Sequence, residues 1–477
     1  MTGLDALEAR LRQDLEWLDL PAKAWVPPTE VQGRMARDVV VIGAGMCGLT
    51  ACAALQRQGM RNIVAYDRAP EGQEGPWVTF ARMRTLRSPK TLTGPALGLP
   101  ALTFRAWYEA QFGADGWAAL GKIPRGQWME YLIWYRRVLG LPVQNRHQVT
   151  AIRPFGALLE LDVAGPAGTE QVLTRHLVLA SGRDGLGGPF VPEIAQPIPP
   201  RFRAHSADDI DFAALSGRRV GVIGAGASAM DNAATALEAG AARLDLFIRR
   251  TDIPRINKFT GIGSQGVVHG FAGLPDEWKW RFLHYVNAAQ TPPPHDSTVR
   301  VSTHPNAYIH LGSPILSLEQ REKELILATP KGKYGLDFVI FATGFQFDLT
   351  RRPELAAFAA HIRLWRDRFP TPAGLESAEL AETPDLAPDY GFQEKHPGSC
   401  PQIARIHCFN HHATLSHGKL SGDIPAVSEG ADRLARGIAR ALFVEDRVKH
   451  FAALQAFDTP ELQGDEWRDA DLLAHTT

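Results

Sequence analysis

The chain has 477 residues, which is long enough for two or three domains with hydrophobic cores of their own. Hydrophobic residues make up 45% of it and charged residues 22%, the composition of an ordinary globular protein. The formal net charge of −1 offers no general attraction to nucleic acid or to an anionic membrane surface, so we expect neither as a partner.

Residues 1–37 predict a helical extension rather than a targeting segment. The first stretch, MTGLDALEARLRQDLEWLDL, carries acidic residues early and has no apolar signal core, so we expect a cytoplasmic protein. No run in the chain approaches the roughly 20 apolar residues that span a bilayer. The leucines of this stretch fall on one helical face, which must be buried against the next domain or a second subunit. A homodimer is therefore among the expectations.

The stretch VVVIGAGMCGLTACAAL, residues 39–55, predicts a strand, a tight glycine turn and a helix. Gly43, Gly45 and Gly48 form a G-x-G-x-x-G pattern, which permits the turn, the approach of a pyrophosphate and close helix packing. The next strand, NIVAYD, ends in Asp67, where a carboxylate can bind a ribose hydroxyl. This unit predicts a site for an adenine dinucleotide without a 2′-phosphate, and the adjacent Arg68 is assigned to it as well.

A second unit, RRVGVIGAGASAMDNAATALEAG, repeats this plan. Its turn contains Gly224, Gly226 and Ala229, and we assign Ser228 to the same site. The following strand, RLDLFIRR, ends in Arg249 and Arg250 instead of an acid. An arginine there pairs with a 2′-phosphate, whereas a carboxylate would repel it, so the second unit predicts an NADPH site. The alternative is that both arginines belong to a solvated strand end.

Two dinucleotide sites in one chain indicate that one holds a bound redox cofactor and the other holds the reductant. Because nicotinamide delivers a hydride, its partner must accept two electrons, and flavin is the usual acceptor. We therefore expect FAD in the first site and NADPH in the second. The fold class is α/β, with two Rossmann-like dinucleotide-binding domains.

Further motifs follow in an order similar to that found in one protein family. Gly75-Pro76-Trp77 is similar to the G-G-x-W turn of flavoprotein monooxygenases, and RFRAHSADDIDFAALSGRRVGVIG is similar to their histidine-containing linker, with His205 at the histidine. LFIRRTDIPR is similar to a Q-R-T-P stretch that grips NADPH, and DFVIFATGFQFD contains the A-T-G motif. From about residue 38 to 445 the chain thus resembles the class B flavoprotein monooxygenases. The resemblance assigns cofactor contacts to Gly75, Trp77, Arg250, Thr251, Thr343 and Gly344.

The resemblance implies tightly bound FAD, NADPH as reductant and O2 as co-substrate, with one oxygen atom transferred to a small organic molecule through a flavin C4a-hydroperoxide. Oxygenation at nitrogen or sulfur is favoured over Baeyer–Villiger insertion, because Arg203 and Ala204 replace the linker glycine after Phe202. In addition, the stretch IPRGQWMEYLIW resembles the N-hydroxylating branch. The alternatives are a flavin reductase or oxidase of the disulfide-reductase superfamily, and a regulatory flavoprotein without turnover.

The resemblance also implies a domain layout. The FAD domain comprises residues 38–204 and 326–477, and a smaller NADPH domain, residues 205–325, is inserted in it. Residues 256–310 match no core motif and predict a helix followed by a mobile segment. They form either a lid on a substrate pocket or a structural satellite.

Candidate catalytic residues come from the same comparison. The stretch RSPK, with Arg87 and Lys90, is similar to an N-S-S-K stretch beside the flavin, although a plain surface loop is an equal alternative. In IPRINK, Arg255 or Lys258 could reach toward the bound nicotinamide. Asp423, in SGD, is expected to contact the FAD ribityl chain, and the alternative is an N-cap aspartate.

Cysteines and histidines predict no dithiol and no metal site. Cys47 and Cys52 lie five residues apart on a helix, a rotation of about 140°, so their thiols point to different faces. The histidines of HCFNHHATLSHGK do not complete a tetrahedral ligand set, because adjacent histidines in a strand point oppositely. Packing residues are the simpler interpretation for both groups.

Overall fold

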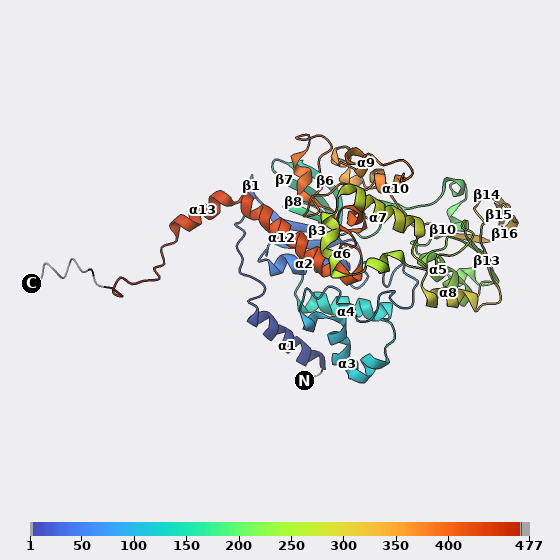
Figure 1. Ribbon diagram of the computed structural model, residues 1–477, viewed down its shortest axis with the longest axis horizontal. Coiled ribbons are helices and arrows are strands. Elements are labelled where there is room, and N and C mark those ends of the chain that lie inside the picture. The colour runs from blue at the N-terminus through green and yellow to red at the C-terminus, as the bar shows by residue number, and fades with distance from the viewer. Residues whose placement is uncertain (1–2, 468, 470–477) are drawn as a thin grey trace, which may run out of the picture.

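The computed structural model describes residues 3–467 and 469, which fold around one mixed and one parallel sheet (Figure 1). The first sheet has seven strands in the order β5-β4-β3-β8-β7-β6, with β19 added beside β8. Its central strands β3, β4, β5, β8 and β19 run parallel, and β6 and β7 are antiparallel. The strands are β3 (Arg37–Ile42), β4 (Ile63–Asp67), β5 (Val143–Asn145), β6 (Gln148–Phe155), β7 (Leu158–Gly165), β8 (Gly168–Leu179) and β19 (Ile406–His407).

The second sheet has five parallel strands in the order β10-β17-β11-β12-β13. These are β10 (Arg203–His205), β17 (Phe338–Phe341), β11 (Arg219–Ile223), β12 (Arg243–Phe247) and β13 (Ala307–His310). A three-stranded antiparallel sheet of β14 (Ser317–Arg321), β15 (Glu324–Thr329) and β16 (Gly332–Leu336) precedes β17. The expected α/β class with two Rossmann-like units is confirmed.

The boundary predicted at residue 325 is wrong, because β17 pairs with both β10 and β11 at the centre of the second sheet. The second unit therefore extends to Phe341. The chain leaves the first unit after β9 (Gly187–Pro189) and returns through β18 (Phe345–Phe347), and these two strands pair antiparallel. The two connections between the units thus lie side by side.

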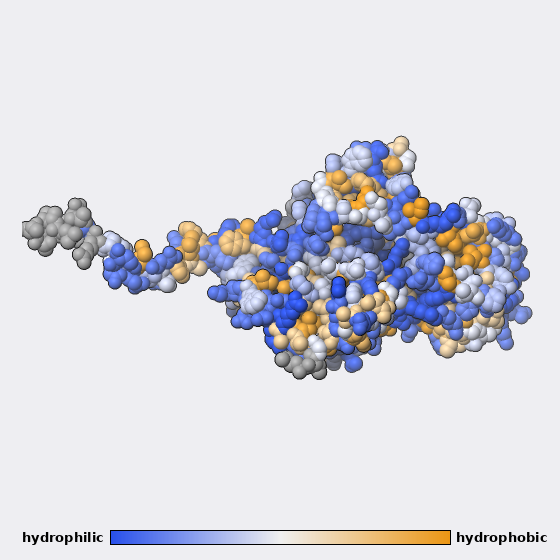
Figure 2. Space-filling model, turned by 60° about the horizontal axis from the view of Figure 1, so that its bottom comes forward, coloured by the Kyte–Doolittle hydropathy of each residue, from blue (hydrophilic) through white to orange (hydrophobic). Residues whose placement is uncertain are grey.

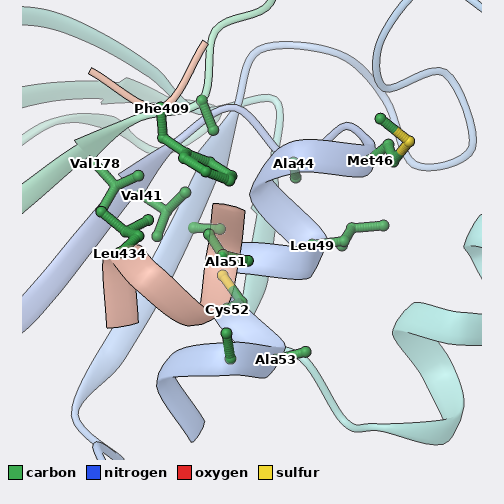
Figure 3. Close-up of a cluster of buried hydrophobic side chains, with 14 of the residues drawn as sticks. Val41, Ala44, Met46, Leu49, Ala51, Cys52, Ala53, Val178, Phe409 and Leu434 are labelled. Carbon is green, nitrogen blue, oxygen red and sulfur yellow. The ribbon is translucent and has the colours of Figure 1, made fainter. Parts of the chain in front are cut away.

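Helices cover both sheets. Figure 3 shows how α2 (Met46–Arg57), which follows the first glycine turn, places Ala51 and Cys52 among Val41 of β3, Val178 of β8 and Leu434 of α12. Small side chains let this helix lie close to the sheet, and Ala51 and Cys52 have no accessible surface. On the second sheet, α5 (Ala227–Glu238) packs against α8 (His295–Ser302).

The N-terminal extension packs on the first unit. In α1 (Gly3–Trp17), Leu7 and Leu11 are buried against α3 (Phe104–Ala119), which lies next to α4 (Arg125–Val138). Leu18 lies beyond the helix and is exposed. The leucine face is therefore covered within the chain. A short hairpin of β1 (Glu30–Val31) and β2 (Arg34–Met35) leads into β3.

The insertion, residues 256–310, is folded rather than loose. It contains η5 (Lys258–Ile262), α6 (Gln265–Gly270), η6 (Phe271–Gly273) and α7 (Asp276–Ala289) before α8. Phe271, Trp280 and Leu283 form a buried cluster with residues of the first unit, namely Trp365 of α9 (Trp365–Arg368), Leu380 of α10 (Ala378–Ala381) and Leu415 of α11 (Thr414–His417). The insertion thus bridges the two units.

The chain ends in α12 (Val427–Glu445), which packs on α2, and α13 (Arg447–Ala456), which projects from the body (Figure 1). Figure 2 shows apolar side chains among polar ones along this projection. In the described residues, no helix is both long and apolar enough to cross a bilayer. The remaining short helices are η1 (Pro100–Leu102), η2 (Glu193–Ala195), η3 (Pro200–Phe202), η4 (Ala213–Leu215), η7 (Leu349–Arg351), η8 (Pro353–Leu355), η9 (Ala359–His361), η10 (Pro401–Arg405), η11 (His411–Ala413) and η12 (Ile424–Ala426).

Candidate functional site

The first glycine turn joins β3 to α2 with no room for side chains. Gly43 has φ +96°, and a Cβ there would lie 2.6 Å from the carbonyl oxygen of Ala180. A Cβ at Gly48 would lie 1.9 Å from the carbonyl oxygen of Gly43. The turn therefore requires glycine at both positions, and the helix N-terminus that follows it is of the kind that binds a diphosphate.

Asp67 ends β4 beside this turn. One carboxylate oxygen accepts the N–H of Ala44 at 2.7 Å, and the other accepts the N–H of Ala69 at 2.8 Å. The carboxylate is therefore held next to the turn, where a ribose hydroxyl can reach it. Arg68 is exposed and lines an open cavity of about 330 Å³ together with Arg146 and Gln148.

The loop that carries Gly75 and Trp77 lies across the turn. A Cβ at Gly45 would be 3.7 Å from the Cα of Gly75, so two glycine backbones face each other. The indole N–H of Trp77 is buried without a hydrogen-bond partner among the described residues, although buried donors are normally paired. Two facing glycine backbones with an unpaired donor beside them fit a dinucleotide, and FAD is the group that the first unit would hold.

Polar side chains of α4 and β5 hold this loop in place through hydrogen bonds. Glu74 accepts hydrogen bonds from Arg136 at 3.1 Å and from Asn145 at 2.6 Å. Arg125 of α4 donates to the carbonyl oxygen of Trp77. The loop is thus tied to α4 and β5 in addition to its own short-range hydrogen bonds.

The second glycine turn is more open. Gly224 has φ +139°, and a Cβ there would lie 2.5 Å from the carbonyl oxygen of Ala342. Nothing lies within 4 Å of the Cβ position of Gly226, and Ser228 is exposed in the first turn of α5. Ala229 is buried and takes the place of the third glycine. The open helix N-terminus can accept the diphosphate of a nicotinamide dinucleotide.

The predicted 2′-phosphate residues lie just after β12. Arg249 is exposed, and the half-buried Arg250 donates a hydrogen bond at 2.7 Å to the carbonyl oxygen of Ala288 near the end of α7. Thr251 is exposed beside them. Arg255 is also exposed, and its guanidinium pairs at 3.0 Å with Asp252. Arg249, Arg250 and Thr251 are therefore available to a ligand at this strand end.

Arg87 and Asp423 act on each other electrostatically, although they are far apart in sequence. Partial burial lowers the pKa of Arg87, and the charge of Asp423 opposes this shift. Asp423 occupies the position before η12, but within the described chain its side chain makes no capping hydrogen bond. The N-cap alternative is therefore not realised. The Asp423 carboxylate lies 3.7 Å from the ammonium of Lys419.

Lys90 does not fit the catalytic role predicted for it. Its ammonium donates to the carbonyl oxygens of Trp117 at 2.6 Å, Leu120 at 2.5 Å and Ala118 at 3.4 Å. These carbonyls end α3, where they have no partner within the helix, and a cation is favoured there. Because all three N–H groups are engaged, Lys90 is a helix cap rather than a residue free to act beside a flavin.

The linker and A-T-G motifs meet between the two units. The Nε2–H of His205 donates to the carbonyl oxygen of Gly344 at 2.9 Å, because its Nδ1 accepts the N–H of Ala207. Thr343 donates its hydroxyl to the carbonyl oxygen of Phe190. Both side chains therefore tie the outgoing connection to the returning one.

The cysteines and histidines have structural partners. All four cysteines are free, and burial raises the pKa of both Cys47 and Cys52 to about 12, which removes them as reactive thiolates. His407 contacts His176 at 3.0 Å, whereas His417 stacks on Tyr390. Within the described residues, no three or more His, Cys, Asp or Glu side chains are placed so that they could hold a metal ion.

The sequence was compared with family models and with individual proteins, and the second comparison places the chain in a family. A family described as pyridine nucleotide-disulphide oxidoreductase matches residues 40–259. The chain is also 40% identical over 470 residues to the FAD-dependent urate hydroxylase of Xanthomonas campestris pv. campestris. The aligned region covers 98% of each protein. The chain belongs to the family of this urate hydroxylase.

The fold of this urate hydroxylase homologue is similar to that of solved monooxygenases. Ornithine hydroxylase from Pseudomonas aeruginosa superposes with a TM-score of 0.67 at 16% identity, over 85% of this chain and 100% of that chain. L-lysine 6-monooxygenase from Pseudomonas syringae gives 0.65 at 18% identity, over 85% and 99%. The fold expected from the resemblance to class B flavoprotein monooxygenases is confirmed, and the identity to an FAD-dependent hydroxylase confirms the expectations of an oxidoreductase and of FAD as its cofactor.

Sequence reasoning missed two residues that the structure brings to this site. Lys419 lies on the turn before Asp423, and its ammonium is 4.7 Å from the ring centre of Phe259 in the insertion. Neither belongs to a motif with fixed spacing. A signal in the sequence existed only for Lys419, which lies between the histidine-rich stretch and Gly422-Asp423 and is therefore close to a predicted cofactor contact.

Proposed function

We propose that this protein is an NADPH- and O2-dependent flavoprotein monooxygenase that hydroxylates urate or a closely related oxidised purine. The observation that carries the proposal is the 40% identity to a urate hydroxylase, which extends over nearly the whole of both chains. An alignment of that extent includes both glycine turns, the insertion and the turn before α12. The C4a-hydroperoxide route implied by the family resemblance is part of the proposal.

The residues of this chain have separate tasks in that reaction. Gly43, Gly45 and Gly48 would cradle the FAD diphosphate, with Asp67 at the ribose and Asp423 at the ribityl chain. Bound FAD supplies the oxygen-transfer chemistry. The protein would orient the substrate and exclude water, so that the activated oxygen reaches the substrate instead of being released as H2O2.

The second turn would bind the reductant. Gly224 and Gly226 would face the diphosphate of NADPH, and Arg249 and Arg250 would pair with its 2′-phosphate. Arg250 is already oriented by its hydrogen bond to Ala288, so less side-chain entropy is lost on binding. Arg255 remains a candidate for a contact further along the cofactor.

The sequence favoured oxygenation at nitrogen or sulfur. Urate contains no sulfur, so the oxygen atom would be transferred to a nitrogen or to a carbon of the urate ring. The test is NADPH oxidation by the FAD-loaded enzyme with and without urate, under 18O2. We expect urate-stimulated oxidation and a product that contains one 18O atom. Oxidation that urate does not stimulate, with all oxygen recovered as H2O2, would instead support a reductase or oxidase.

A homodimer is part of the proposal, and α13 is the observation that supports it. Among the described residues of α13 none is buried, and the helix exposes Val448, Phe451 and Leu454. An exposed apolar helix face is typical of an interface. In a symmetric dimer, α13 of each copy would be buried against the other copy. Light scattering on the full chain and on a chain ending at Asp446 tests this, with a dimer expected only for the full chain.

A further inference from the structure

The turn formed by residues 418–423 lies against the first glycine turn. The thiol of Cys47, inside the G-x-G-x-x-G pattern, is 3.4 Å from the carbonyl oxygen of Ser421. The hydroxyl of Ser421 in turn donates to the carbonyl oxygen of Asn410 at 2.6 Å, which fixes the turn on the first unit. Lys419 and Asp423 stand on this turn, so Lys419 lies beside the site that would hold the flavin.

The insertion covers the same turn from the other side. Phe271 of η6 is completely enclosed, and a Cβ at Gly418 would lie 3.2 Å from its ring. Phe259 of η5 presents its ring to the Lys419 ammonium at 4.7 Å, a cation–π contact. Two aromatic side chains from the second unit therefore pack over a turn of the first unit.

Positive charge exceeds negative charge around this turn. Lys419 has Asp423 as its ion-pair partner at 3.7 Å, which is a loose contact, and the side chain of Lys419 remains about one-third exposed (34%). Arg87 also acts on Asp423, so two cations share one carboxylate. A third cation, Arg183, lies close enough to affect His411 on the same side.

His411 lies next to this turn, near Gly422, and adds a neutral polar side chain to it. Its side chain is exposed beside the turn. The surrounding protein, helped by the charges of Arg183 and Lys419, lowers its pKa below the usual value of a histidine. At neutral pH the imidazole is therefore uncharged and does not compete with Lys419 for an anion.

We propose that Lys419 is the residue that recognises the negative charge of the substrate, and that Phe259 packs against the substrate ring. This inference rests on the proposed function and specifies its substrate class as a planar, anionic heterocycle. Urate meets that description because it is a monoanion at neutral pH. An ammonium is a compact donor that can contact its charged edge, while the aromatic ring supplies the apolar face.

The test is steady-state kinetics of the FAD-loaded enzyme with urate at saturating NADPH. We expect Lys419→Met to raise the KM for urate roughly 10- to 100-fold, the range of one charge-assisted hydrogen bond, with much less effect on kcat. Lys419→Arg should restore most of the affinity. Phe259→Leu should raise the KM about three- to tenfold, whereas Phe259→Tyr should leave it nearly unchanged.

Two further readouts separate recognition from a structural role. Wild-type affinity for urate should fall as the pH is lowered through the pKa of urate itself, and Lys419→Met should flatten this profile. Binding of hypoxanthine, a neutral purine, should not change in the variant. Lys395→Met is the matched control, because Lys395 is a similarly exposed lysine that pairs with Asp367 at 3.1 Å away from the glycine turns.

The outcomes distinguish the two proposals. If wild-type enzyme shows no urate-dependent NADPH oxidation, the proposed function fails and this inference fails with it. If wild-type enzyme hydroxylates urate but Lys419→Met keeps the same KM and the same pH profile, only the role of Lys419 is overturned. Flavin absorbance and thermal unfolding confirm that each variant is folded and loaded with FAD.

Discussion

Replacing Gly48 by alanine is a direct test of how the first turn holds its cofactor. A Cβ at this position would lie 1.9 Å from the carbonyl oxygen of Gly43 and 2.8 Å from its carbonyl carbon. Both atoms belong to the backbone of the turn, so no side chain can move aside to relieve the contact. The start of α2 must shift by about 1 Å or more, and overpacking of this kind costs about 3 kcal/mol or more of stability.

The expected result has two parts. The free energy of unfolding should fall by about 3 kcal/mol, at the upper end of overpacking costs, because backbone must move. In addition, the purified protein should contain little FAD, since the displaced helix N-terminus no longer faces the diphosphate. Guanidinium unfolding followed by fluorescence and the ratio of flavin to protein absorbance measure the two effects.

Ala229→Gly is the matched control. Ala229 occupies the same place in the second turn, where alanine is tolerated, and its removal costs about 1–2 kcal/mol through helix propensity and one lost methyl group. This variant should retain full FAD content. The reasoning is refuted if Gly48→Ala unfolds at the same guanidinium concentration as the wild type and carries FAD at full occupancy.

Three further changes test other parts of the molecule. Arg249→Ala and Arg250→Ala should each raise the KM for NADPH roughly 10- to 100-fold and leave the KM for NADH nearly unchanged, whereas equal effects on both cofactors would disprove a 2′-phosphate contact. Lys90→Met removes the cap of α3 and should lower the free energy of unfolding by about 1–3 kcal/mol without changing KM values, and a selective loss of kcat in a stable variant would contradict this. Burial raises the pKa of Asp38 to about 6, so the folded state favours its protonated form, and its contribution to stability is present below about pH 4 and lost as the pH rises through 6. Asp38→Asn should therefore gain stability over the wild type by up to about 3 kcal/mol between pH 4 and 7, measured by unfolding at several pH values, and a gain that shrinks with rising pH would reverse the argument.

Each glycine turn could be predicted from sequence because its determinants are local. Gly43 and Gly224 both adopt positive φ, as tight strand-to-helix turns require, and Asp67 follows on the next strand within one βαβ unit. Contacts within such a unit depend on spacing along the chain. The α/β class, the two glycine turns and their order therefore followed from the motifs alone.

Positions that depend on distant partners could not be predicted in this way. Lys90 was matched to a motif lysine, but its role is set by carbonyls of α3 that lie about thirty residues later in the chain. Similarly, β17 belongs to the second sheet because it pairs with β10 and β11, and the motif order that set the predicted boundary does not include that pairing.

The amino-acid sequence by itself determined that this protein has two glycine turns whose following strands end in opposite charges, because glycine conformations and strand-end residues depend on spacing within one βαβ unit. Only the tertiary structure brought together the two side chains that we propose as substrate contacts. Lys419 and Phe259 are 160 residues apart and come from different units, yet the ammonium lies 4.7 Å from the ring. Their meeting depends on the packing of the insertion against the first unit, which is the sum of many weak apolar contacts rather than the property of any short stretch.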